Sequence, residues 1–140
     1  IKFIPMKMYS FVTAITVMIV FISCTKDHDE KTCEPVLRKV RYELYAADNF
    51  AGQKTNITFR IIMRNDRTHK IYIDSSLATM KVEEIPDFQH RIIIEKLVPG
   101  NDTATLTVGF INYLEGSSIA WRLEEFEKGD NFIVTKWPFL

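Results

Sequence analysis

Apolar and polar side chains alternate along the chain from residue 36 to its end. In the first such stretch Val40, Tyr42 and Leu44 share one face, while Lys39 and Arg41 share the other. Successive side chains of a strand point to opposite faces of a sheet, so this alternation predicts half-buried β-strands. The expected strands cover residues 36–45, 55–64, 69–74, 80–85, 90–98, 103–113, 119–124 and 132–137.

Turn-forming residues separate these stretches, most strongly at Pro99-Gly100-Asn101-Asp102. Seven or eight short strands joined by such turns predict an all-β protein, an antiparallel β-sandwich with a barrel as the alternative. Residues 90–98 are apolar on both faces, which indicates a strand in the centre of a sheet or covered on both sides. Asp74-Ser75-Ser76 is expected to leave the strand pattern and cap a turn.

The segment from Trp121 to Lys128 is the one candidate for a helix. Its apolar stripe is interrupted by polar residues, so we expect a strand there instead. On the alternation, Trp121 shares a face with Ile119 and Leu123, and we expect that face to pack into the core.

The amino-terminal part of the chain follows a different pattern, because an apolar run from Phe11 to Ile22 ends abruptly in a charged stretch. Translation is expected to start at Met6 or Met8, and a start at Met6 places the basic Lys7 before this run. A run of about 12 apolar residues is short for a membrane-spanning helix, which needs roughly 20. The pattern predicts a secretory signal peptide over residues 1–23, a disordered charged tether over 24–35 and the β domain over 36–140.

The junction Phe21-Ile22-Ser23-Cys24 resembles the lipobox of bacterial lipoproteins, with Phe21 in place of the usual Leu or Val. The resemblance implies cleavage between Ser23 and Cys24 and lipidation of Cys24. Two or three acyl chains anchor a protein stably to a membrane, whereas one chain is marginal.

The residues after the cysteine are similar to the export signal of some Gram-negative surface lipoproteins. The similarity rests on Lys26, Asp27, Asp29 and Glu30. It implies an outer-membrane lipoprotein displayed on the cell surface; the other reading of these residues is a plain charged linker, which would leave the protein facing the periplasm.

The whole plan resembles small Gram-negative lipoproteins that carry one transthyretin-like or immunoglobulin-like β-sandwich. The resemblance covers the signal peptide, the tether and the spacing of the strands. It also includes the strand-ending sequences Ile85-Pro86-Asp87 and Val98-Pro99. No function follows from it.

Charge and cysteine content narrow the function classes. Residues 24–140 carry 16 basic and 18 acidic side chains, a net charge of −2, which argues against nucleic acid as a partner. Two cysteines are too few for a disulfide framework. Lipidation of Cys24 leaves Cys33 as a lone thiol, and the alternative is a Cys24–Cys33 disulfide in the tether.

No sequence motif of a catalytic nucleophile, phosphate loop or cofactor site is present, so we expect no enzyme, no cofactor and no metal. The spacing of the three histidines does not fit a zinc site, and one of them lies in the tether. They are His28, His69 and His90. Carboxylates cluster at residues 83–87 and 124–127, and single ones stand in turns at Asp66, Asp102 and Asp130.

Aromatic side chains are the remaining candidates for a binding site. Tyr45, Tyr72, Tyr113 and Trp137 would offer a stacking surface for a carbohydrate or an apolar protein partner if they face outward. The sequence thus favours a lipid-anchored, non-enzymatic binding or accessory module. The alternative is a structural component of an envelope complex that pairs through edge strands.

Three observations would separate these classes. An exposed aromatic patch would favour ligand binding, and a long uncapped edge strand with apolar side chains would favour assembly. A cleft with converging carboxylates or histidines would favour an enzyme.

Overall fold

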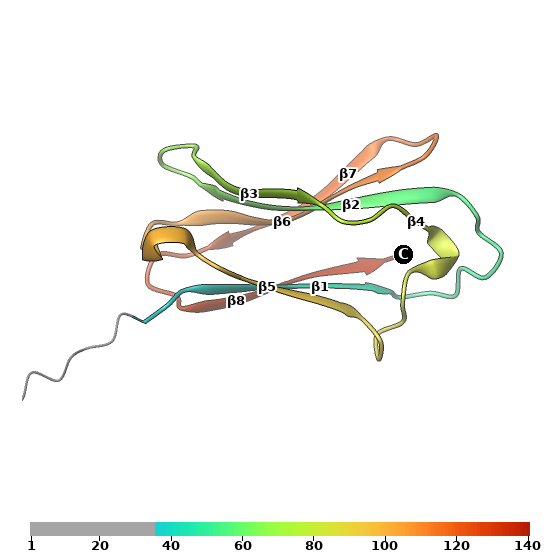
Figure 1. Ribbon diagram of the computed structural model, residues 1–140, viewed down its shortest axis with the longest axis horizontal. Helices are drawn as coiled ribbons and strands as arrows, with labels where there is room; N and C mark the ends of the chain where they lie inside the picture. Colours follow the sequence, from blue (N-terminus) through green and yellow to red (C-terminus); the bar gives the residue numbers. More distant parts are fainter. Residues whose placement is uncertain (1–35) are drawn as a thin grey trace, which may run out of the picture. The chain divides into compact units, whose positions relative to one another are not determined.

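A computed structural model describes residues 36–140, which form two β-sheets packed face to face (Figure 1). The elements are β1 (Lys39–Ala46), β2 (Asn56–Asn65), β3 (Ile71–Ser76), β4 (Met80–Lys81), the 3₁₀ turn η1 (Val82–Glu84), β5 (Ile92–Leu97), the 3₁₀ turn η2 (Pro99–Asn101), β6 (Leu106–Leu114), β7 (Ile119–Phe126) and β8 (Phe132–Phe139).

The smaller sheet has the strand order β5-β1-β8, and the larger has the order β3-β2-β6-β7 with β4 also paired to β2. This arrangement confirms the all-β sandwich predicted from the alternation. The pairs are antiparallel with one exception, since the first strand β1 and the last strand β8 run parallel from Lys39 opposite Phe132 to Ala46 opposite Phe139.

The core lies between the two sheets and is built from the inward residues of β1, β2 and β6, the central strands. All of these side chains are at most 1% exposed: Val40, Tyr42, Leu44, Ile57, Phe59, Ile61, Met63, Leu106, Val108 and Phe110. Tyr42 packs edge-on against Phe110 and donates a hydrogen bond of 2.9 Å to the Ile62 carbonyl of the opposite sheet. Residues 35–140 therefore form a compact unit with a core of their own.

Four expectations need correction. Residues 92–97 form β5 at the edge of the smaller sheet and not in its centre, and Ile93 and Leu97 are exposed on its outer side. The expected strand 80–85 is only the two-residue β4 followed by η1, which is capped by a hydrogen bond from the Lys81 amide to the Glu84 carboxylate. Asp74-Ser75-Ser76 continues β3 instead of turning the chain. The smaller sheet is also not wholly antiparallel, because β1 and β8 run parallel.

The strand expected around Trp121 is confirmed as β7, but its orientation is the reverse of the expected one. Trp121 lies opposite Ile111 and Leu123 opposite Gly109, on the outer face of the larger sheet. The side chains of β6 that face the core include Leu106, Val108 and Phe110.

Candidate functional site

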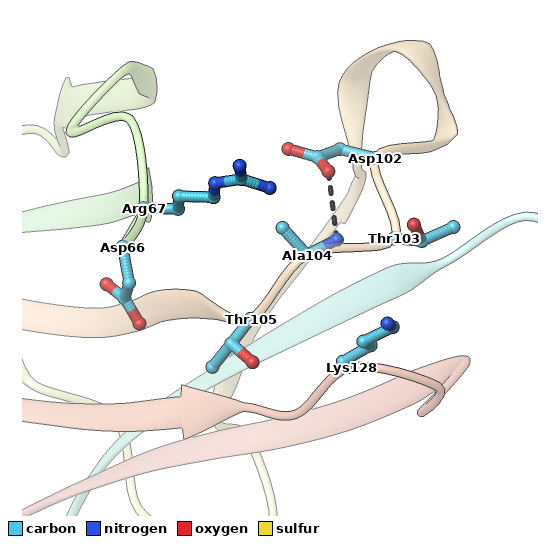
Figure 2. A pocket seen from close by; sticks show the side chains of 7 residues that line it. All are labelled: Asp66, Arg67, Asp102, Thr103, Ala104, Thr105 and Lys128. Carbon is cyan, nitrogen blue, oxygen red and sulfur yellow. Dashed lines mark hydrogen bonds between the residues drawn. The ribbon is translucent and has the colours of Figure 1, made fainter.

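A polar groove lies at one end of the sandwich, where the loops before β6 and after β2 and β7 meet (Figure 2). Its volume is about 600 Å³ and it opens widely to solvent. The lining residues are Asp66, Arg67, Asp102, Thr103, Ala104, Thr105 and Lys128.

Asp102 is the most tightly held carboxylate of the groove. It accepts hydrogen bonds from Asn65 Nδ2 and Tyr72 Oη, both at 2.6 Å. It also accepts one from the Ala104 amide at 2.9 Å (Figure 2). These donors, with Tyr72 the strongest, lower the pKa of Asp102, and the same bond raises the pKa of Tyr72. Asp102 thus fixes the loop that follows η2, and its oxygens are committed to the fold.

Arg38 lies directly before β1 and is 3% exposed. Its guanidinium donates to backbone carbonyls of two loops and of the last residue of β7, at distances between 2.7 and 3.3 Å. The accepting residues are Asp102, Ala104, Phe126, Glu127 and Asp130. The guanidinium also lies 4.0 Å from the centroid of the Phe126 ring, in a cation–π contact.

Burial lowers the pKa of Arg38, and the carboxylates of Asp102 and Asp130 oppose that effect. Arginine still keeps its charge in proteins, so this is a buried cation satisfied by carbonyl dipoles. The alternation gives one signal for it, since Arg38 falls in the inward phase of Val40 and Tyr42.

The groove offers little that could do chemistry. Asp66 accepts a hydrogen bond from the Thr107 hydroxyl, so both carboxylates serve the fold. Arg67 and Lys128 balance them in charge and are exposed. No group of three or more metal-ligating side chains occurs in residues 36–140. A second open groove of about 500 Å³ lies between the loop after β1 and η1 and is lined mainly by loop residues.

The four aromatic residues predicted to contact a ligand are spread over the molecule and do not form one site. Tyr45 packs edge-on against Phe88 on the outer side of the smaller sheet, and Tyr72 is tied to Asp102. Tyr113 is partly exposed, and its hydroxyl accepts a hydrogen bond of 3.0 Å from Arg60. Trp137 faces the core, where its ring lies 6.3 Å from that of Phe110, so it does not face outward as the prediction requires.

The other candidate side chains are solvated or structural. His69 and His90 are exposed, and His90 pairs with Asp87 at 2.8 Å. Asp74 binds the Arg60 guanidinium, which lowers the pKa of Asp74. The residues predicted for processing, lipidation and export lie outside the described residues, as do His28 and Cys33: Ser23, Cys24, Lys26, Asp27, Asp29 and Glu30.

An exposed apolar surface covers the outer side of the β6–β7 hairpin, and we call it the β7 face. Its members are Ile111, Tyr113, Ile119, Trp121 and Leu123. Trp121 is 69% exposed and Ile119 is 50% exposed, unusually high values for side chains of this size. In Figure 1 the end of this hairpin rises away from the smaller sheet.

The β7 face results from register and strand order. The hairpin places Trp121 beside Ile111 and Ile119 beside Tyr113, so the five side chains form one continuous patch on neighbouring strands. This face points away from the smaller sheet, and the exposure of Trp121 and Ile119 shows that nothing covers it within residues 36–140. The alternation of Ile119, Trp121 and Leu123 predicted that these side chains share one face. It placed that face in the core, whereas the structure places it outside.

No helix in the described part of the chain is long and apolar enough to span a membrane. Comparisons with protein-family models, with curated proteins and with solved structures found no match to this chain.

Proposed function

We propose that the protein is a lipid-anchored component of the cell envelope that binds a protein partner through the β7 face and catalyses no reaction. The anchor rests on the similarity of residues 21–24 to a lipobox, with Cys24 as the lipidated residue. The acidic stretch around Lys26 supports display at the surface of the outer membrane. The binding role rests on one observation, the exposure of Trp121 and its apolar neighbours on an edge strand.

The chemistry of the β7 face favours a protein partner over a carbohydrate. A carbohydrate site needs polar groups around an aromatic platform, and here Trp121 is flanked by the aliphatic Ile119 and Leu123. Among the charged groups on that face, Arg60 and Asp74 are paired with each other, and Glu125 follows Leu123 at the end of β7. Large aromatic and aliphatic side chains with a polar rim are typical of protein interfaces.

The second candidate function is assembly through edge strands. It is favoured by the length and regularity of β7, which has eight consecutive residues paired to β6 on one side and no strand on the other in the described structure. Such an edge presents unpaired backbone groups to a partner strand.

The anchor is tested by replacing Cys24 with Ser in the full-length protein and labelling the cells with palmitate. We expect the original protein to be labelled metabolically with palmitate and the variant to lose that label. An original protein that takes up no palmitate, or a variant that is labelled equally, would contradict the lipid anchor at Cys24.

Binding is tested by placing a photoreactive benzophenone amino acid at position 121 and irradiating intact cells. We expect crosslinked products from position 121. The matched control is the same substitution at Ile71, which is also exposed on the larger sheet but lies away from the β7 face. Equal crosslinking from both positions, or none from position 121, would contradict the binding role.

A further inference from the structure

The free edge of β7 lacks the proline and the register shift that protect two other strand edges of the sandwich, and its charged side chains are Arg122, Glu124 and Glu125. β8 carries Pro138, which lacks an amide donor, and β3 pairs with a register shift beside Met63. On β5 the outward Glu95 is bound by two basic side chains of β1. β7 has no proline, and its pairing with β6 has no register shift. Proteins usually block such an edge unless it is used.

The charges on β7 are arranged for a strand that runs in the opposite direction. Arg122 and Glu124 flank Leu123 and share the side of β7 opposite to Trp121. Within one chain their closest atoms, Arg122 Nε and Glu124 Oε1, are 3.8 Å apart, at the limit of an ion pair. Both side chains remain partly exposed, so this contact adds little stability.

We propose that two copies of the protein pair antiparallel along β7, with the two-fold axis at Leu123. This inference rests on the proposed function and names its partner. In this register Arg122 lies opposite the Glu124 of the second copy and the reverse pair also forms, while the two Leu123 side chains meet on the β7 face. Residues 120–126 of both copies then pair, all within β7.

The neighbouring two-fold registers fit the charges less well. A shift that centres the pair on Arg122 places two guanidinium groups opposite each other, which is unfavourable across a strand pair. A shift that centres it on Trp121 places Arg122 opposite Ala120 and forms no ion pair. Charge complementarity therefore selects the register centred on Leu123.

The expected dimer is weak in solution. A single strand pair with one small apolar contact buries less than the roughly 1,200–2,000 Å² of a stable protein interface. Confinement of both copies to one membrane raises their effective concentration, so a weak contact suffices at the site where the anchored protein acts.

The test uses residues 35–140, which have their own core, in sedimentation equilibrium over a wide concentration range. The variants are Arg122→Glu and Glu124→Arg. Each places like charges opposite each other in its own dimer, and we expect each to weaken self-association by about tenfold or more. Mixing the two variants restores both opposite-charge pairs, so the mixture should dimerise about as well as the original domain.

The mixing experiment isolates the contact between chains. The like charges within each variant chain persist after mixing, so recovery of association can come only from the pairing of two different copies. An original domain that stays monomeric throughout overturns the proposal. A dimer that ignores both substitutions, or one that mixing does not restore, overturns pairing in this register.

Two controls keep the proposed function and this inference separate. Crosslinking from position 121 to a different protein, with a monomeric domain, would support the proposed function and overturn self-pairing. Binding of a monomeric domain to phosphatidylethanolamine and phosphatidylglycerol vesicles, abolished by Trp121→Ala, would show that the β7 face contacts lipid and would overturn both.

Discussion

Arg38 joins parts of the chain that are far apart in sequence, because its five carbonyl partners come from the loop before β6, the last residue of β7 and the loop after β7. Replacing Arg38 with Ala would leave these carbonyls without their donor and open a cavity beside Phe126. We expect a loss of about 3–5 kcal/mol in the free energy of unfolding, measured by urea denaturation.

The matched control for Arg38 is Arg41→Ala, three residues further along the chain in β1. Arg41 is partly exposed and forms an ion pair with Glu95 on the outer side of the smaller sheet, so its loss should cost less than about 1 kcal/mol. Similar costs for the two substitutions would contradict a structural role for the buried guanidinium.

Asp102 makes the stability of the domain depend on pH. Its pKa is lowered in the folded protein, so the unfolded chain binds more protons and stability falls as the pH is lowered. The contribution is complete above the unfolded pKa of about 4 and is lost as the pH falls through the folded pKa. The Asp102→Asn variant should be about 1–3 kcal/mol less stable at pH 7, and the gap should shrink by pH 3.

Urea denaturation of both proteins at pH 7, 4 and 3 measures this difference. The original domain will lose stability over this range for other reasons too, since the pKa values of Asp74, Asp87 and Glu95 are also lowered. The comparison with Asp102→Asn removes that background. A gap of constant size would contradict the role of the ionised carboxylate.

At the scale of elements, Gly109 sets how closely β6 and β7 approach. Its φ of 151° suits glycine, and a Cβ there would lie 2.1 Å from the Arg122 carbonyl oxygen. We expect Gly109→Ala to cost about 2 kcal/mol or more and to lower the hydrogen-exchange protection of the β7 amides.

Gly116→Ala in the same hairpin separates strain from contact. Gly116 also has a positive φ of 76°, but nothing lies within 4 Å of a Cβ built there. This variant should lose only about 1 kcal/mol and keep the protection of β7. A larger loss at Gly116 than at Gly109 would contradict the close approach of the two strands.

The elements also show what the alternation can predict. It located β1, β2 and β6, and it grouped Val40, Tyr42 and Leu44 correctly on one face, because each of these strands is a central strand with one face in the core. It misplaced β5 and β7, which are edge strands with apolar side chains turned outward. A period of two shows which residues share a face but not which face meets the other sheet, and that depends on strand order and register.

The same reason limits prediction of the site. The groove depends on loops that meet only in the folded protein, and the partners of Arg38 lie 64 to 92 residues away. No local pattern around Arg38 contains that information. The β7 face, in contrast, was visible as apolar residues, and only its direction was missed.

At the scale of the whole molecule, the groove and the β7 face differ in how much they contribute to stability. The groove is held by Asp102 and Arg38, which stabilise the sandwich, so substitutions there test the fold. The β7 face contributes little to the core, because its largest side chain is mostly solvent-exposed. Substitutions of Trp121 therefore test binding without strongly affecting stability.

The parallel pairing of β1 with β8 has a mechanical consequence. Both ends of the domain leave from these neighbouring strands, the amino-terminal end before Lys39 and the carboxy-terminal end after Phe139. A pull between the two ends loads β1 and β8 in opposite directions along their length. All pairs from Lys39–Phe132 to Ala46–Phe139 then resist the force together in shear, and they do not separate one pair at a time.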